Sequence, residues 1–278
     1  MYIYIYIMLI SPNSFKNYCI VNSLLCFMGL VQYLSINYVA DFNLLNHLLC
    51  MFSVFVFRNY ALLYFISYGT QHKPSINNSS VEPLEEYKYE FHKNVLTATS
   101  VETITHIFIK STIMDVAFSR NICYEVIYFI PASFLFEIIF DFFHYVTHRA
   151  MHHQWVYKLS HKKHHKFKHP TAITSFYQDP IDLIITNSVP TILTILVTPQ
   201  LTYPMFHFIA VYKTFIEIGG HSGKVSRPTS SFPQFIWLPK WLNIELYSEN
   251  HDKHHSANNC NYSKRFSLWD KVFNTYAR

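Results

Sequence analysis

The hydrophobic positions of the chain gather into long runs that are separated by short polar stretches. The run Cys19–Ile36 carries no charge and has about the length that crosses a bilayer. A second run, Phe42–Tyr68, is also long enough, but Arg58 and Asn59 lie in its middle. This run predicts either one tilted helix with Arg58 turned inward or two shorter buried pieces. Before both runs, the first ten residues alternate Tyr and Ile, as a β-strand would.

A polar linker and an amphipathic helix are expected after these two runs. The stretch Thr70–Asn94 contains two prolines and four glutamates, which is typical of a linker. From Val101 to Phe118 the apolar positions recur at helical spacing among polar and charged residues. This pattern predicts a helix that packs on the membrane bundle or lies at the membrane interface.

The remaining apolar runs complete a membrane bundle. Ile122–Phe143 is apolar enough to span despite its acidic residues, and Pro131 is expected to kink it. Ile181–Val197 and Met205–Gly219 are short and are joined by Thr198–Pro204, which predicts a tight membrane hairpin. The chain is therefore expected to be all-α, an integral membrane helical bundle of about four spans with a cytosolic helical cap. Residues 1–100 would hold the N-terminal membrane helices and the linker, and residues 101–278 the cap and its histidines.

Composition supports a membrane protein and excludes several other classes. Half of the residues are hydrophobic and only 14% are charged, against about 25% in a soluble domain, and disordered chains are poor in the aromatic residues that are 18% here. No glycine-rich phosphate loop occurs, and the five cysteines form neither a C-x-x-C pair nor a disulfide framework. The net charge is +5, but the basic residues flank apolar runs, as at the ends of membrane helices, so nucleic-acid binding is not expected.

Histidine is the residue type that stands out. The chain has 17 histidines, and eight of them form one H-x-x-x-H motif and two H-x-x-H-H motifs. On a helix, residues at i, i+3 and i+4 share one face, so each motif would point two or three imidazoles the same way. We expect the three faces to converge on one place. The eight residues are His144, His148, His161, His164, His165, His251, His254 and His255.

This many imidazoles suits two metal ions rather than one. Structural zinc takes four ligands and catalytic zinc usually three, so eight or more nitrogens would serve two ions with four or five each. Imidazole alone does not choose the metal. Because the first motif directly follows Ile122–Phe143, the ions would lie just outside the bilayer, within reach of a lipid. Two irons there can activate oxygen against an unreactive C–H bond, whereas zinc has no redox chemistry.

The same stretches resemble a known family. Asp141–Pro170, DFFHYVTHRAMHHQWVYKLSHKKHHKFKHP, is similar to the first two histidine boxes of the fatty acid hydroxylase superfamily, membrane non-haem di-iron enzymes that include sterol 4-methyl oxidases and sterol desaturases. Glu217–Gly223 resembles the H-S-G segment of the sterol branch, and Glu249–Thr275 resembles its last box and tail. The similarity covers about residues 120–276. Lys224 departs from the branch, which usually has an aromatic residue there.

The resemblance implies an oxygen-dependent di-iron lipid monooxygenase or desaturase that resembles the sterol 4-methyl oxidases. It would hydroxylate, oxidise or desaturate a sterol-like or long-chain lipid in the endoplasmic reticulum membrane, with electrons delivered in trans by cytochrome b5 or a reductase. A fatty-acyl or ceramide hydroxylase of the same superfamily and a non-catalytic membrane metal-binding protein are the alternatives. The implied cofactor is two Fe ions, although overexpression can load zinc. The implied ligands are the eight histidines above, with His221 of H-S-G and His152 as further candidates.

Two carboxylates and a basic stretch add to this prediction. Asp141 lies one turn before His144, where it could accept a ring N–H from a ligand or simply end the membrane helix at the headgroups. Glu217, four residues before His221, could contact the metal or a ligand. Between Phe142 and Gln178 there are six positive charges and no acidic residue, which predicts that the histidines face the cytosol. The six residues are Arg149, Lys158, Lys162, Lys163, Lys166 and Lys168.

Overall fold

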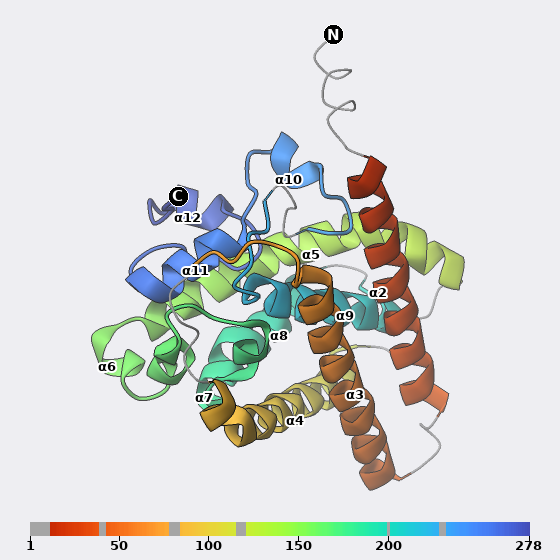
Figure 1. Cartoon of the computed structure of the whole chain (residues 1–278). Helices are drawn as coiled ribbons and strands as arrows, with labels where there is room; N and C mark the ends of the chain where they lie inside the picture. The colour runs from red at the N-terminus through yellow and green to blue at the C-terminus, as the bar shows by residue number, and fades with distance from the viewer. Residues whose placement is uncertain (1–11, 39–42, 78–83, 115–120, 199–200, 228–231) are drawn as a thin grey trace.

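The computed structural model of the chain describes residues 12–38, 43–77, 84–114, 121–198, 201–227 and 232–278 (Figure 1). Its described regular elements are helices, so the all-α prediction is confirmed, whereas the Tyr and Ile alternation at the N-terminus lies outside the described residues. In chain order they are α2 (Pro12–Tyr38), α3 (Leu44–Thr70), η1 (Leu84–Tyr87), α4 (Lys88–Thr112), α5 (Ile122–Met151), α6 (Gln154–Tyr157), η2 (His161–Lys166), η3 (Ala172–Phe176), α7 (Pro180–Leu183), η4 (Ile184–Ser188), α8 (Val189–Val197), α9 (Tyr203–Gly220), α10 (Leu238–Trp241), α11 (Ser248–Ala257) and α12 (Leu268–Val272).

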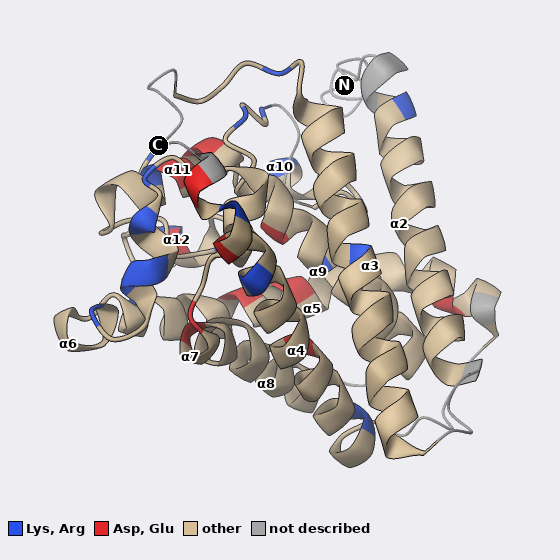
Figure 2. Cartoon of the chain, turned by 60° about the horizontal axis from the view of Figure 1, so that its bottom comes forward, with Lys and Arg blue, Asp and Glu red and all other residues tan. Residues whose placement is uncertain are grey.

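Four of the described helical segments are long and apolar enough to cross a membrane. They are Phe15–Asn37, Leu44–Thr70, Cys123–Met151 and Pro180–Val197. Their number confirms the prediction of about four spans. Figure 2 shows that α2 and α3 are almost free of charge, while lysines and arginines gather near α6, α11 and α12. This charge distribution is the one expected for helices in lipid and a cap in water.

Helix α9 is the centre of the bundle. It packs against α2, α3 and α5, and Figure 1 shows it crossing the middle of the molecule. Every residue from Tyr203 to Tyr212 is buried, and a helix that is apolar all round belongs inside a protein. Its start is fixed by Thr202, whose hydroxyl accepts the N–H of Met205 at 3.3 Å. The predicted second arm of the hairpin is therefore a core helix.

Helix α3 is one continuous helix with Arg58 turned inward, as one of the two interpretations of its sequence predicted. Arg58 is 2% exposed and forms an ion pair with Glu102 of α4. Its guanidinium also donates to Gln32 of α2 at 3.1 Å and to Asn59 at 2.7 Å. A buried charge needs such partners, so this network fixes how α2, α3 and α4 face one another.

The linker between α3 and α4 is shorter than the sequence predicted. Helix α4 begins at Lys88, inside the stretch Thr70–Asn94, and thirteen residues before the predicted helix start at Val101. The helix extends backwards because Phe91 and its neighbours bury an aromatic cluster against Phe167 and Tyr177. Helix α4 ends at Thr112, with Ile113 as its C-cap, so it ends before the predicted helix does; the predicted last residue, Phe118, lies outside the described residues.

Asp141 has different partners from the ones expected. Its carboxylate accepts the backbone N–H groups of Lys264 at 2.7 Å, Arg265 at 3.0 Å and Phe266 at 3.0 Å, rather than a histidine ring. Three converging backbone donors satisfy a buried carboxylate better than one ring N–H can. Helix α5 also continues past Asp141 to Met151, so this residue does not end the helix. It ties the C-terminal segment to α5.

Close contact between α2 and α9 depends on Gly29. A Cβ at this position would lie 2.5 Å from the Phe208 ring and 3.2 Å from the Phe208 Cα. We expect Gly29→Ala to lower the free energy of unfolding in detergent by about 1–3 kcal/mol, because Phe208 must move in a packed core. The matched control is Gly69→Ala in α3, where a Cβ meets nothing within 4 Å and should be neutral or slightly stabilising. Equal thermal midpoints for both variants would contradict this packing.

Candidate metal centre

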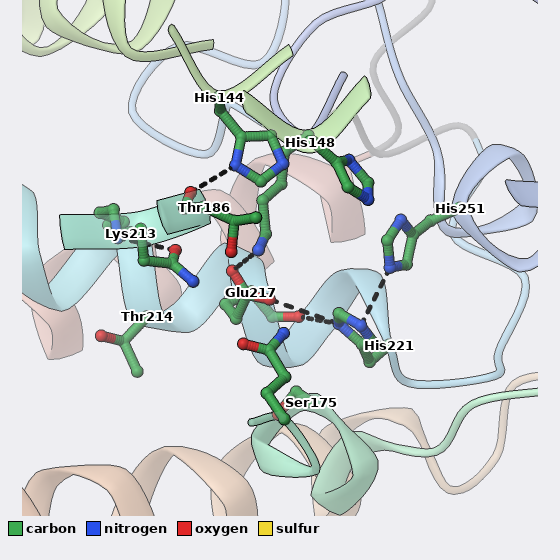
Figure 3. Close-up of polar contacts among 12 residues, drawn as sticks. His144, His148, Ser175, Thr186, Lys213, Thr214, Glu217, His221 and His251 are labelled. Carbon is green, nitrogen blue, oxygen red and sulfur yellow. Dashed lines mark hydrogen bonds and ion pairs between the residues drawn. The ribbon is translucent and has the colours of Figure 1, made fainter. Parts of the chain in front are cut away.

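Four segments far apart in the sequence bring their histidines together beyond the end of the bundle. His148 comes from the last turns of α5, and η2 supplies the histidines of the second motif. His221 follows α9 directly, and α11 supplies the last motif. Figure 3 shows His144, His148, His221 and His251 entering one region from these separate elements. The predicted convergence of the motifs is therefore present in the structure.

Two groups of histidines result, and each could hold one metal ion. Within each group the candidate ring nitrogens all lie within 4.8 Å of one another. The groups adjoin, since the ring centroids of His165 and His255 are 4.6 Å apart. The five-histidine group contains His148, His152, His161, His165 and His254, and the four-histidine group contains His164, His221, His251 and His255.

The ring nitrogens contact one another at spacings that suit a bound cation. The Nε2 atom of His251 lies 3.0 Å from that of His221 and 3.2 Å from that of His255. One proton or one lone pair on His251 cannot satisfy both contacts. Two ligands at right angles on an ion with bonds of about 2.1 Å are about 3.0 Å apart, so an ion fits these spacings.

The five-histidine group repeats this arrangement. Nε2 of His161 lies 3.1 Å from Nε2 of both His152 and His165. Nε2 of His254 is buried and has no hydrogen-bond partner. A buried ring nitrogen without a partner is costly unless something that the ring can ligate occupies the space. Both groups are therefore suited to a metal.

The opposite ring nitrogens are held by protein acceptors. His148 Nδ1 donates to the Tyr262 carbonyl at 2.8 Å, and His254 Nδ1 donates to the Cys260 carbonyl at 2.7 Å. A neutral imidazole that donates from Nδ1 presents the lone pair of Nε2, which fixes the tautomer that binds a metal. These carbonyls follow the last motif in the chain, in the tail that resembles the family, but the sequence analysis gave neither residue a role.

Two side-chain acceptors were also missed. Asp182 is fully buried, and its carboxylate accepts from His161 Nδ1 at 2.8 Å. Gln178 faces His164 Nδ1 at 3.0 Å through its amide nitrogen, while its own Oε1 is buried without a partner. Exchanging the amide oxygen and nitrogen places the acceptor opposite His164 Nδ1–H. An acidic residue inside the apolar run Ile181–Val197 was the signal that could have identified Asp182.

His144 is the only predicted ligand that the structure leaves outside both groups. Its ring lies tilted beside that of His148, with centroids 4.9 Å apart, and Nδ1 donates to the Thr186 carbonyl at 2.7 Å (Figure 3). Thr186 lies in η4, a π-helical turn whose wider hydrogen-bond spacing changes the direction of backbone carbonyls. The structure thus anchors His144 by a backbone carbonyl, as it does His148 and His254, but places it beside the five-histidine group.

Glu217 and Gly223 hold the H-S-G segment in place. The Glu217 backbone carbonyl accepts from His221 Nδ1 at 2.8 Å, and its carboxylate forms an ion pair with Lys264 (Figure 3). Glu217 thus bonds to the candidate ligand His221 through its backbone carbonyl, while its carboxylate Oε1 lies 3.7 Å from His221 Nδ1. Gly223 adopts a φ of 66°, and a Cβ there would lie 2.6 Å from the Pro170 carbonyl oxygen, so only glycine fits.

Burial keeps the candidate ligands neutral. Loss of solvation lowers the pKa of His254 to about 3 and that of His221 to about 4, against an ordinary value of 6.5. It lowers the pKa of His152 to about 2. Metal ligation requires unprotonated imidazole, so the site is prepared to bind metal at neutral pH.

A cavity of about 440 Å³ borders the four-histidine group. Its lining includes His221 and His251, the first turns of α2 and the last turns of α3 and α9. Most of this lining is apolar, and α2 and α3 are both candidate membrane helices. A volume of this size accommodates a small molecule or part of a lipid chain.

The sequence is similar to several lipid-oxidising proteins. It is 31% identical over 150 residues to the fatty acid hydroxylase vlmA of Lecanicillium sp, covering 51% of this chain and 41% of that protein. It is 29% identical over 147 residues to the C-4 methylsterol oxidase erg25 of Schizosaccharomyces pombe, covering 51% of this chain and 45% of that protein. It is 30% identical over 149 residues to the very-long-chain aldehyde decarbonylase GL1-9 of Oryza sativa subsp. indica, covering 50% of this chain and 52% of that protein. No solved structure matches.

These matches cover about half of each relative or less, so they compare one region and not whole proteins. The fatty acid hydroxylase family model matches residues 133–275, which include both histidine groups and the segments that anchor them. That match spans half of the chain. The chain belongs to the fatty acid hydroxylase family.

Proposed function

We propose that the chain is a membrane non-haem di-iron oxidoreductase that uses oxygen to hydroxylate, oxidise or desaturate a sterol-like or long-chain lipid. The observation that carries the proposal is the pair of buried histidine groups beside a mostly apolar cavity, which is bordered by two candidate membrane helices. The relatives act on fatty acids, methylsterols and very-long-chain aldehydes according to their names, and all of these are lipids.

The residues of the chain have four tasks in this reaction. Bound iron would supply the redox chemistry that activates oxygen for attack on a C–H bond. The nine grouped histidines would hold the two ions, with His144 beside them. Carbonyl and carboxylate acceptors at Nδ1 keep several of the rings oriented, as in the contact of His161 with Asp182. Burial excludes water from the histidines, and the cavity wall holds the lipid chain against His221 and His251.

We further propose that the histidines face the cytosol in the endoplasmic reticulum membrane. The stretch from Phe142 to Gln178, which begins in the last turns of α5, carries six basic residues and no acidic one, and Lys158, Lys162 and Lys168 are exposed. Basic residues beside a membrane helix favour the cytosolic side. The same surface is suited to an acidic electron donor in trans, such as cytochrome b5 or a reductase.

Metal content and turnover together test the proposal. We expect about two irons per chain and oxygen-dependent product from a lipid extract supplied with a reductase and cytochrome b5. His165→Gln and His251→Gln should each lose iron and lower turnover by more than about 100-fold, because each removes a ligand from one group. His153→Gln is the matched control, because His153 is an exposed neighbour outside both groups. A protein that binds metal in both groups but yields no product with any donor would be a non-catalytic metal-binding protein.

Asp182→Asn tests the acceptor behind His161. The amide keeps the shape of the side chain but removes the charge that orients the ring and strengthens its basicity. We expect iron affinity to fall roughly 10- to 100-fold, measured by competition with a chelator, while the apoprotein stays folded. Unchanged affinity would show that the contact does not support a metal ligand. Asp179→Asn, at the exposed start of α7, serves as the control.

The pH dependence of stability follows from the neutral histidines. His254 and His221 have folded pKa values of about 3 and 4, whereas the unfolded chain takes up protons near 6.5. The unfolded state therefore binds more protons below pH 6.5, so stability is present above that pH and is lost as the pH falls towards the folded pKa values. We expect the unfolding free energy of metal-free protein to fall between pH 7 and 5, by up to about 1.4 kcal/mol per pH unit for each such histidine. A thermal midpoint that is flat over this range would contradict the burial of neutral rings.

A further inference from the structure

We propose that the cavity beside the four-histidine group binds a single-chain lipid with an anionic head group, and that Lys73 and Lys224 hold that head. The inference rests on the proposed function and narrows its substrate class from lipids in general to those with a carboxylate or phosphate at one end. It concerns recognition of the head, which the histidine motifs do not determine.

The walls of the cavity are suited to an alkyl chain. Helix α2 contributes Ile20 and Val21, α3 contributes Phe65, and α9 contributes Phe215 and Ile216. The lining reaches the surface of the candidate membrane helices, since Ile20 is 49% exposed. A lipid tail can therefore pass from the bilayer into the cavity without crossing water.

The charges on the lining do not balance. Its charged side chains are Lys73, Lys224, Lys264 and Glu217. The Glu217 carboxylate forms an ion pair with Lys264. No second carboxylate on the lining neutralises Lys73 and Lys224. Among the described residues, neither Lys73 nor Lys224 forms an ion pair. Two half-buried lysines on the lining of a mostly apolar cavity favour an anion.

Backbone pairing holds the two lysine segments side by side. Ser75 and Lys224 form an antiparallel bridge, with Ile76 N donating to Gly223 O at 3.0 Å and Val225 N donating to Pro74 O at 3.0 Å. The Lys224 ammonium donates to Ser75 Oγ at 3.0 Å, which positions it at the bridge. Both lysines line the same cavity, and the bridge holds their segments together. We call Lys73 and Lys224 the cationic rim.

The cationic rim lies at the metal end of the cavity. Lys224 is three residues after His221, and three residues of extended chain span at most about 10 Å. A head held at the rim therefore places the first part of its chain near the four-histidine group. A sterol hydroxyl is neutral and gains much less from two ammonium groups than a carboxylate or phosphate does.

Binding by the full-length protein in a neutral detergent tests the inference without turnover. We would measure retention of radiolabelled oleate, oleoyl lysophosphatidate, oleyl alcohol and cholesterol. The wild type should bind at least one of the two anionic lipids roughly tenfold more tightly than oleyl alcohol, which has the same chain without the charge. The oleate and lysophosphatidate results distinguish a carboxylate from a phosphate head.

Three paired variants separate charge from structure. Lys73→Gln with Lys224→Gln should weaken the anionic lipid about tenfold and leave oleyl alcohol unchanged. Lys73→Arg with Lys224→Arg should still bind the anionic lipid more tightly than oleyl alcohol, because the positive charge is kept. Lys158→Gln with Lys168→Gln is the control, because both lysines are exposed and neither lines the cavity.

The inference is overturned if wild type binds oleyl alcohol as tightly as both anionic lipids, or if the glutamine pair weakens all ligands alike. Its failure is distinct from that of the proposed function. Lysine-dependent binding without any oxidation would contradict only the enzyme proposal, and oxidation without lysine dependence would contradict only this one.

Discussion

The candidate metal centre depends on imidazole nitrogens that face one another at about 3 Å with too few protons between them. Such contacts repel in the absence of a cation, because the rings are buried and neutral and no water can separate them. The surrounding structure holds them there through acceptors behind several of the rings and through backbone contacts that fix the supporting segments. Holding the rings in these positions therefore destabilises the metal-free fold, and metal binding would stabilise it.

Much of this centre could be predicted from sequence because histidine spacing is a local property. A residue at i+4 lies about one turn along a helix from residue i, and Nε2 of His161 and His165 are 3.1 Å apart, as those of His251 and His255 are 3.2 Å apart. The residue at i+3 was expected on the same face, but His164 and His254 each lie in the other group. The length and low charge of α2, α3 and α5 likewise predicted the membrane helices. Arg58 was more difficult, since only the structure shows the partners that make its burial possible.

The parts that could not be predicted depend on long-range contacts. Asp141 was paired with its neighbour His144 on the basis of helical spacing, but three backbone donors from the C-terminal segment occupy it. Thr186 became an acceptor because a π-helical turn changes the direction of its carbonyl, and no residue pattern indicates that turn. The early start of α4 reflects an aromatic cluster completed by Phe167 and Tyr177, far along the chain.

Each H-x-x-H-H motif is divided between the two groups. His164 lies in one and His161 and His165 in the other, while His254 is separated in the same way from His251 and His255. Each short segment therefore carries candidate ligands of both groups, so the two positions are mechanically coupled. If each group holds an ion, the first ion would rigidify the segments that complete the second position, and loading would be cooperative. The centre would then be found mainly as empty or fully loaded protein, with few singly loaded molecules.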